Sequence, residues 1–476
     1  MALTFLALEV VSWWREKRFV ALLLATVVTL LVATVWATAG DIDRRQAQRA
    51  ASTEARAQWE GYGAANPHSM AHFGDFVFRP SGALARLDRG VQARVGKVLR
   101  VEGHRQGIPL HADAAQAGTL VRFPRLDAAY LLQVVVPLLL VFLGATGLAA
   151  DRSAGRLRLS LVQGASALAV LGGRVLALWG LGIVLVALVG LTSVLTSVAW
   201  VGEPGIAADR LLAWALVHSV FLAVVSLGVV ALAAWLAEAR AALLVALALW
   251  VVATAVLPRA TAGAAGALYP LPSQDDFQAQ LVAAREAGPD GHNPEDMRLA
   301  ELQAEVLQEH GVETVEELPM NFDGIRMQVD EEFANRAWDQ HYGNLRREME
   351  RQRTFASLVS VANPFQAVDH LSMALAGTDL AHDLDFQRQA EAYRRALVEQ
   401  LNHEHAYGGS KTGDWSWKAP AAFFAGLNAF HYTPPTITAA VAARVAELGS
   451  LALWAGLLLI AVLRGATRIE RGAVAC

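Results

Sequence analysis

Cysteine and charge are both scarce in this chain. Among 476 residues the one cysteine is Cys476, the last residue, so no internal disulfide can hold the chain together. Charged residues make up 18% of the chain, against about 25% in ordinary globular proteins. The hydrophobic residues, 54% of the total, are concentrated in runs of about 20, long enough to cross a bilayer. The sequence therefore predicts an integral membrane protein, and its net charge of -4 gives no indication of nucleic-acid binding.

A phosphate-binding loop is also missing. No segment matches G-x-x-x-x-G-K-[ST], and in the most similar stretch, 408–412, Ser410 separates the glycines from Lys411. We therefore do not expect this chain to be an enzyme that hydrolyses ATP. No Ser-His-Asp or Cys-His arrangement stands out either. Such groups are assembled in space rather than in sequence, so a membrane-bound enzyme stays open as a third class of function.

Ionisable residues are rare within the apolar runs. His218 and Glu447 are the examples we find. Carriers driven by protons or sodium usually need buried acids, which are costly in a membrane and are kept for function. The driving energy is therefore expected to enter elsewhere. For His218, a hydrogen bond between helices is a simpler interpretation than a proton relay.

The remaining pattern predicts an all-α polytopic membrane protein with six transmembrane helices and two mostly helical extracytoplasmic domains. The first run ends at Ala37-Thr38-Ala39, which resembles a signal-peptide cleavage site, but its length favours a retained anchor. The tryptophans and basic residues before it suit an interfacial helix, although a simple extension of the first span is equally compatible. The predicted segments are an interfacial helix 1–18, spans 19–39, 129–150, 175–200, 211–237, 241–257 and 445–463, extracytoplasmic domains 40–128 and 259–444, a cytoplasmic coupling loop 151–174 and a cytoplasmic tail 464–476.

Basic residues set the orientation. They cluster before the first span, in the loop 151–174, at Arg240 and in the tail, whereas the short loop 201–209 has none. The positive-inside rule then places both termini and the loop 151–174 in the cytoplasm. Both large domains then lie outside the cytoplasm. The family resemblance given below implies that this is the periplasmic side of a cell inner membrane.

Two histidine clusters lie in the predicted outer domains. His68 and His72 are four residues apart and would share one face of a helix, as metal ligands can. His403 and His405 form the second cluster. Neither completes a motif such as H-E-x-x-H. We therefore assign no metal site and keep these four residues as weaker candidates beside the alternative of polar structural side chains.

The loop 151–174 is the strongest functional candidate. Leu157, Leu161 and Ala165 recur at helical spacing among arginines, with glycines on both sides. A positive loop explains the arginines but not the amphipathic pattern. A short helix parallel to the membrane, presented to a cytoplasmic partner, explains both.

This loop resembles the coupling segment of type-2 ABC transporter permeases. In that family an acidic residue and basic residues precede Gly, followed by a Leu-Arg-rich stretch, Gln-Gly, and later Gly-Lys. Here Asp151 replaces the usual Glu, Arg156 the usual Thr and Arg174 the usual Lys. The resemblance implies that the residues contacting the ATPase are Asp151, Arg152, Gly155, Arg156, Arg158, Gln163, Gly164 and Arg174.

Further stretches narrow the resemblance to a subgroup similar to NosY. The segments 66–74, Asn363-Pro364 and 371–379, continued by Phe386, Glu391, Tyr393 and Arg394, look like signatures of permeases with large extracytoplasmic insertions after the first and fifth spans and a domain of unknown function. Such permeases pair with a second permease subunit, identical or paralogous, and with two cytoplasmic ATPase subunits. ATP and Mg²⁺ are then bound in the partner ATPase, and this chain needs no cofactor of its own.

Two functions follow from this resemblance. An exporter permease would move a substrate outward or extract it from the lipid bilayer, and should have a polar path between its spans. A mechanotransmission or assembly protein would relay ATPase motion to its outer domains, and should have a tightly packed apolar membrane core. The nearly charge-free spans favour the relay, or an amphiphilic substrate over an ionic one.

Overall fold

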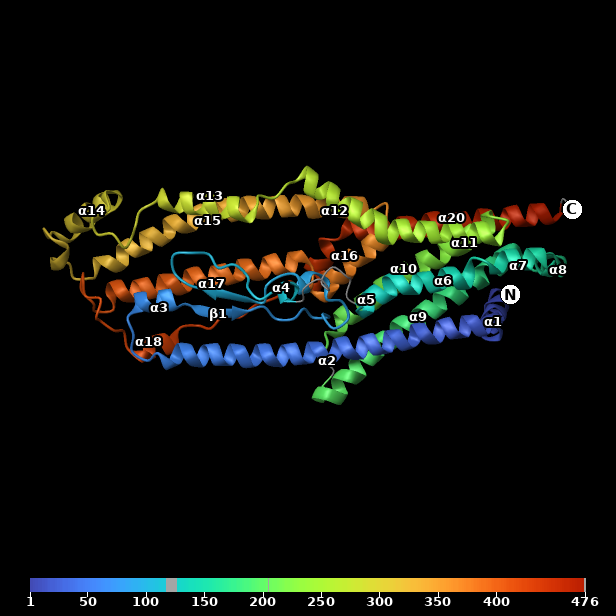
Figure 1. Cartoon of the computed structure of the whole chain (residues 1–476), viewed down its shortest axis with the longest axis horizontal. Helices are drawn as coiled ribbons and strands as arrows, with labels where there is room; N and C mark the ends of the chain where they lie inside the picture. Colours follow the sequence, from blue (N-terminus) through green and yellow to red (C-terminus); the bar gives the residue numbers. More distant parts are fainter. Residues whose placement is uncertain (117–125, 204, 475–476) are drawn as a thin grey trace.

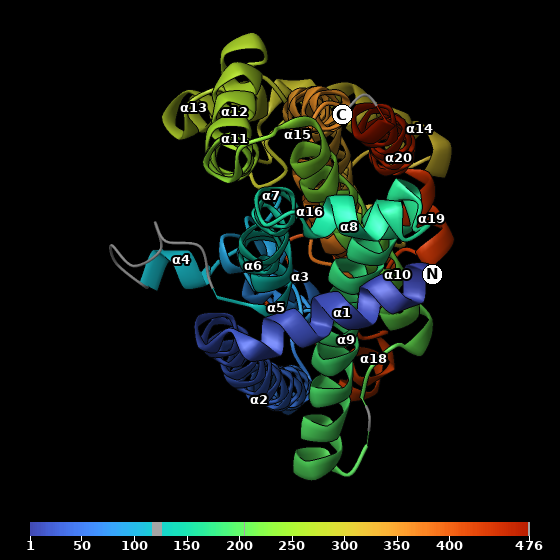
Figure 2. The same ribbon diagram turned by 90° about the vertical axis from the view of Figure 1, so that its right-hand side faces the viewer.

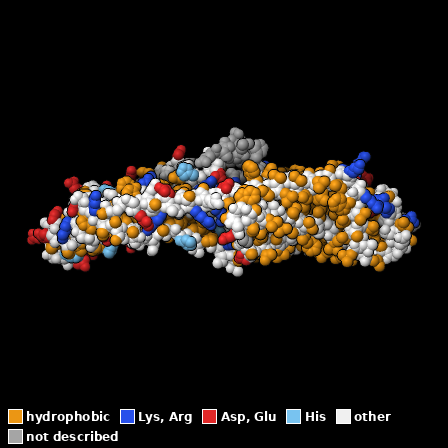
Figure 3. All heavy atoms as spheres, turned by 90° about the horizontal axis from the view of Figure 1, so that it is seen from below, with side chains coloured by type: hydrophobic (Ala, Val, Ile, Leu, Met, Phe, Trp, Pro, Cys, Tyr) orange, Lys and Arg blue, Asp and Glu red, His pale blue; other side chains and the backbone are white. Residues whose placement is uncertain are grey.

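The computed structural model describes residues 1–116, 126–203 and 205–474. Cys476 lies outside these residues. The molecule is elongated, with a bundle of apolar helices at one end and a polar assembly at the other (Figure 1). Its surface changes from predominantly hydrophobic to charged along the long axis (Figure 3). We call these two parts the membrane half and the polar half.

The described residues contain six helices long and apolar enough to cross a membrane, and the chain is 75% helical with very few strands. The prediction of an all-α polytopic membrane protein is confirmed. The six helical segments are Lys17–Gly61, Ala128–Ser153, Ala167–Val201, Ala208–Trp235, Ala239–Leu268 and Val445–Gly472.

The first of these helices runs through both halves. Helix α2 (Lys17–Gly61) continues well past the predicted span 19–39, so the predicted domain 40–128 begins as an extension of the same helix (Figure 1). Helix α1 (Ala2–Arg15) precedes it and is separated from it by Glu16, whose backbone is extended. Because of this break, α1 lies across the bundle instead of continuing along α2 (Figure 2).

Two membrane helices contain a π-helical turn directly before a proline. The second span consists of α5 (Ala128–Tyr130), the π turn η3 (Leu131–Val135), α6 (Val136–Gly144) and α7 (Gly147–Ser153). The fifth consists of α11 (Ala239–Val251), the π turn η4 (Val252–Val256) and α12 (Leu257–Leu268). Proline has no N–H to donate and disturbs the preceding turn. Within a membrane the carbonyls freed in this way need other donors.

Side chains of neighbouring elements donate to carbonyls within the two π turns. The indole N–H of Trp250 donates to the Val134 carbonyl over 3.0 Å. The amide of Asn363 donates to the Ala253 carbonyl over 2.8 Å. Asn363 also caps α16 (Pro364–Ala376) by accepting from the Phe365 amide. The first residue of the Asn-Pro pair noted in the sequence therefore both starts α16 and satisfies a backbone group of the fifth span.

Helix α16 is part of the membrane core. It packs on α10 (Ala208–Trp235) and α20 (Val445–Val474), which also contact α9 (Ala167–Val201). Its residues Val368, Leu371 and Leu375 belong to the same buried apolar cluster as Trp214 and Phe221 of α10. One continuous core thus extends from the membrane helices into the start of the polar half.

The polar half is built around three long helices, which are the outer part of α2, α15 (Phe322–Ser360) and α17 (Leu380–Tyr407) (Figure 1). An antiparallel hairpin of β1 (Asp75–Phe78) and β2 (Val98–Val101) lies among them, with Asp75 opposite Val101. The shorter elements are α3 (Pro67–Phe73), η1 (Gly90–Ala93), α4 (Asp113–Gln116), α13 (Gln274–Glu286), η5 (Met297–Leu299), α14 (Ala300–His310), η6 (Val315–Glu317), α18 (Ala421–Gly426) and α19 (Ile437–Ala442).

Candidate functional site

The predicted coupling segment lies at the end of the membrane half that is farthest from the polar half (Figure 1). It comprises the end of α7, the short helix α8 (Arg156–Val162) and the start of α9. Helix α1 and the C-terminal end of α20 lie at the same end (Figure 1). We call this group of elements the distal end. Residues 167–174 of the predicted loop already belong to α9.

Two glycines delimit α8. Gly155 has φ of 72° and Gly164 has φ of 91°, both in the left-handed region that suits glycine. The first turns the chain between α7 and α8, and the second follows the end of α8 at Gln163. Both glycines are open to solvent, since an added Cβ would meet nothing within 4 Å. Their role is therefore to shape the segment and not to allow close packing.

Asp151 joins α7 to α8 and α9, and Arg174 extends this connection to α1. Its carboxylate accepts a hydrogen bond from Arg156 over 2.6 Å and another from Arg174 of α9. Arg174 also lies 3.7 Å from the Glu9 carboxylate of α1. Burial raises the pKa of Glu9, while the charge of Arg174 opposes that rise. A displacement of Asp151 would therefore also displace α9 and, through Arg174, α1.

Arg152 joins the coupling segment to α10. Its guanidinium donates to the carbonyls of Ala233, Ala234 and Leu236 over 3.3, 2.8 and 3.0 Å. These carbonyls lie at the C-terminal end of α10, where the helix has no further amides to satisfy them and where a positive charge is favoured. Arg152 thus acts as the C-terminal cap of that helix.

The outward face of α8 is unusually apolar. Leu157 is buried against the membrane core, but Leu159 and Val162 are 58% and 78% exposed. Arg158 and Gln163 are exposed as well. The predicted site residues therefore separate into two groups. Asp151, Arg152 and Arg174 are tied to the membrane helices, whereas Arg158 and Gln163 are free to meet a partner.

One glycine of the predicted loop has a different role. Gly173 lies in α9 where α1 crosses it, and a Cβ there would come within 2.5 Å of the Phe5 Cβ. It therefore permits the contact between α1 and α9. Sequence spacing alone does not reveal this, because the partner residue is far away in the chain.

A chain of polar side chains crosses the membrane core near the polar half. His218 Nε2 lies 3.1 Å from the Gln133 amide nitrogen, and its Nδ1 lies 2.8 Å from the Trp214 carbonyl oxygen. The predicted hydrogen bond between helices is therefore present. The Trp214 indole donates to Ser372 over 2.8 Å, and Ser372 donates to Asp88. This chain links the second and fourth spans to α16 and to the segment between the two strands.

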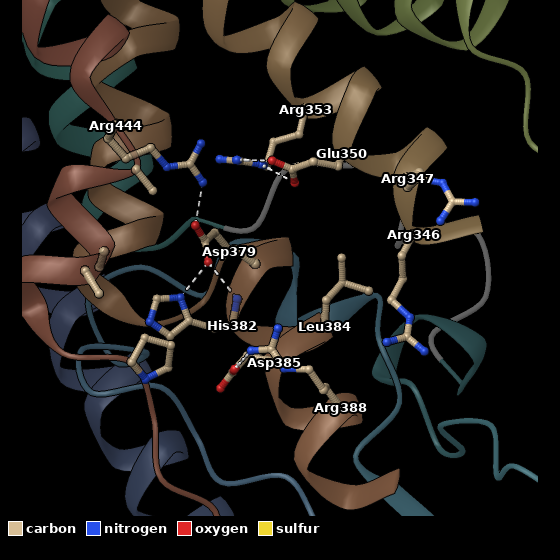
Figure 4. A pocket seen from close by; sticks show the side chains of 15 residues that line it. Arg346, Arg347, Glu350, Arg353, Asp379, His382, Leu384, Asp385, Arg388 and Arg444 are labelled. Carbon is tan, nitrogen blue, oxygen red and sulfur yellow. Dashed lines mark hydrogen bonds and ion pairs between the residues drawn. The ribbon is translucent and has the colours of Figure 1, made fainter. Parts of the chain in front are cut away.

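A cavity of about 440 Å³ lies where the polar half meets the membrane half (Figure 4). One wall carries arginines of α15 and α17, and the other consists of alanines and a proline around α19. Arg444 forms ion pairs with Asp379 and Glu447. Burial acts to raise the pKa of Asp379, but His382 and Arg444 together hold it below its usual range. The lining residues are Arg346, Arg347, Glu350, Arg353, Asp379, Ala381, His382, Leu384, Asp385, Arg388, Pro435, Ala439, Ala440, Ala443 and Arg444.

The histidine candidates are partly brought together. His68 and His72 lie on α3 with their Nε2 atoms 2.9 Å apart, and His405 lies near His68, with ring centres 6.3 Å apart. His403 lies outside this group, and its ring packs on that of Tyr407 with ring centres 4.8 Å apart. Two further histidines, His104 and His292, complete the group around His68 and His72. Both are isolated in the sequence, so no local spacing pattern could have identified them.

Comparison with known proteins identifies one family. Residues 277–433, about a third of the chain, match a domain of unknown function (DUF3526). No curated protein and no solved structure matches the chain. The matched region runs from within α13 to beyond α18. It includes one wall of the cavity and also α16, which packs in the membrane core.

Proposed function

We propose that this protein is the transmembrane permease subunit of an ATP-driven ABC exporter. In this proposal the distal end faces the cytoplasm of a bacterial-type inner membrane, and the polar half faces the periplasm. The two cytoplasmic ABC ATPase subunits bind ATP and Mg²⁺ and dock on α8. A second permease subunit, identical or paralogous, completes the transporter.

The observation that carries the proposal is the construction of the coupling segment. Helix α8 exposes Leu159 and Val162 beside Arg158, a combination suited to a groove on a partner protein. Its base is fixed by Asp151 to α9 and by Arg152 to α10, and Arg174 extends the connection to α1. A force applied to α8 would therefore move α1, α9 and α10 together, as coupling of ATP hydrolysis to the spans requires.

The cavity at the boundary between the halves supports an amphiphilic substrate. Arginines on one wall and small apolar side chains on the other would suit a molecule with an anionic group and an apolar portion. Three of the arginines are already paired, Arg353 with Glu350, Arg388 with Asp385 and Arg444 with Asp379. Arg346 extends from α15 along the cavity (Figure 4), whereas Arg347 donates a hydrogen bond to Asn344. We assign Arg346 the role of binding the anionic group.

A relay function is the second candidate, because α2 crosses both halves as one helix. At its outer end, Arg56 donates to the carbonyls of Ala425 and Leu427, and Trp59 donates to that of Phe424. Motion at the distal end could thus reach α18 along a single element. In this alternative the ATPase still docks on α8, but no solute crosses the membrane.

The docking proposal is tested by co-purification with a co-expressed ABC ATPase. We compare the wild type with Gly155→Pro combined with Arg158→Glu. Proline requires φ near −65°, whereas Gly155 has φ of 72°, so the variant should distort α8 and reverse an exposed charge. We expect ATPase recovery to fall at least about tenfold, since a loss of about 1.4 kcal/mol in docking is enough for that.

The matched control is Arg336→Glu, a reversal of an exposed charge in the polar half outside the cavity, which should capture the ATPase as well as the wild type does. If the coupling variant also binds equally well, or if no ATPase binds the wild type, the proposal is wrong. The comparison requires that the permease variant and the ATPase are both present in membranes at the wild-type level.

A further inference from the structure

Four imidazole rings, from the predicted outer domains 40–128 and 259–444, meet in the polar half. His68 and His72 lie one turn apart on α3, His104 follows β2, and His292 lies in the loop between α13 and η5. One ring nitrogen from each of the four lies within 4.8 Å of those of the other three. Four nitrogens bound to one tetrahedral ion at about 2.0–2.1 Å would lie about 3.4 Å apart. Small side-chain adjustments would bring the group to that geometry.

We propose that His68, His72, His104 and His292 bind one divalent transition-metal ion of the zinc class. Neutral imidazole is a preferred ligand of such ions. Four protein ligands would leave no open position, which is typical of structural and not of catalytic zinc sites. The ion would connect two segments of the domain 40–128, which are α3 and the turn 102–105, to the loop 288–296 of the domain 259–444. This site is independent of the proposed transport function.

The backbone presents these rings to one another. Asn66 caps α3 by accepting from the Ser69 amide over 3.1 Å, and its own amide donates to the carbonyls of Trp415 and Trp417. This anchors the helix that carries the first two ligands. His104 has φ of 64°, an uncommon conformation for a residue with a side chain. The rest of the fold therefore imposes that conformation, which places the His104 ring within the group.

Carboxylates lie beside two of the four rings. His104 Nδ1 lies 3.1 Å from Glu331 Oε1 and 3.6 Å from Asp330 Oδ2, and His292 Nδ1 lies 3.6 Å from Asp290 Oδ1. Metal-bound histidines commonly donate their second N–H to such a carboxylate, which fixes the tautomer and the ring orientation. The same carboxylates would balance the charge of a divalent ion. Glu331 is itself held by Arg394, whose Nη1 lies 3.1 Å away.

Several ring nitrogens of this group have no hydrogen-bond partner within the described part of the protein. Among the described residues, His68 Nδ1 and His104 Nε2 are buried without a hydrogen-bond partner, and His104 Nδ1 approaches Glu331 without the geometry of a hydrogen bond. The competing explanation is a metal-free group held by the contact between His68 Nε2 and His72 Nε2.

The test is a metal titration of the full chain in detergent, purified without a histidine tag and treated with a chelator. We expect one Co²⁺ per chain, with the strong visible absorption of a tetrahedral site, and displacement of Co²⁺ by Zn²⁺. His292→Ala should weaken the affinity at least about 100-fold, because it removes a ligand. Zn²⁺ should also raise the unfolding temperature of the wild type more than that of this variant.

His292 is chosen because its side chain is 42% exposed and lies in a loop, so its loss should leave the metal-free unfolding temperature unchanged. The matched control is His403→Ala, an exposed histidine of α17 that lies outside the group. It should bind Co²⁺ as the wild type does. Binding that is absent, that is not one to one, or that is equally strong in His292→Ala overturns the proposal and favours the metal-free histidine group.

Discussion

Asp127 shows how one buried carboxyl near the boundary between the halves is controlled. It caps α5 by accepting from the Tyr130 amide over 2.9 Å, and it accepts from the Arg89 amide over 3.2 Å. Burial raises its pKa to about 6, although these two hydrogen bonds oppose the rise. Asp88 and Asp369 lie close enough to add to the repulsion, and burial raises the pKa of both. The native state therefore binds protons here that the unfolded chain releases.

A pH dependence of stability follows from Asp127. A carboxyl with a raised pKa in the folded state stabilises the fold fully below its unfolded pKa, near 4, and loses that contribution as pH rises through 6. Asp127→Asn keeps the cap but cannot ionise. Relative to wild type, it should therefore gain up to about 1.4 kcal/mol per pH unit between pH 4 and 6. Unfolding midpoints measured at pH 4, 5, 6 and 7 check this, and parallel curves for the two proteins would contradict it.

At the scale of elements, the unbroken length of α2 is the most informative feature. Hydropathy predicts where the apolar run ends, near Ala39, because that is a local property of composition. The helix continues because its polar part packs in the polar half, as the ion pair of Asp41 with Arg86 illustrates. Helices inside proteins are stabilised mainly by such packing, which the local sequence does not record.

Kinking this helix distinguishes the relay from the exporter. Ala51 is exposed on α2, and Ala51→Pro should cost about 3 kcal/mol locally and bend the helix. A spin label at Gly426→Cys, in a Cys476→Ser background, reports motion of α18. An added Cβ at Gly426 meets nothing within 4 Å. The measurement is made on the complex with the ATPase. If α2 relays motion, ATP should change the label's mobility in the otherwise wild-type chain and in Ala51→Ser, but not in Ala51→Pro. An unchanged response in the proline variant would exclude α2 as the relay.

At the scale of the whole molecule, charge asymmetry predicts one orientation in the membrane. The single native cysteine makes this measurable, since Cys476→Ser gives a background without reactive thiols. Val162 on α8 and Met297 in the polar half are 78% and 81% exposed, so both positions are accessible to a reagent.

In intact spheroplasts a membrane-impermeant maleimide should label Met297→Cys. It should label Val162→Cys only after the membrane is permeabilised. The opposite pattern would reverse the orientation and would make docking of a cytoplasmic ATPase on α8 impossible. Labelling of both positions after solubilisation in detergent is the control for reactivity.

The sequence by itself determined the membrane class and the number of apolar helices long enough to cross a membrane. Hydrophobicity and helical periodicity act over one or two turns, so they can be read directly along the chain. It also suggested that His68 and His72 share a helical face, which they do on α3.

The tertiary structure decided which distant residues meet. His104 and His292 join the histidine pair from two separate loops, Arg174 connects Asp151 to Glu9, and α16 enters the membrane core from the polar half. These contacts depend on the packing of whole helices and on backbone conformations such as that of His104. No local pattern encodes them, because each partner lies on a different element.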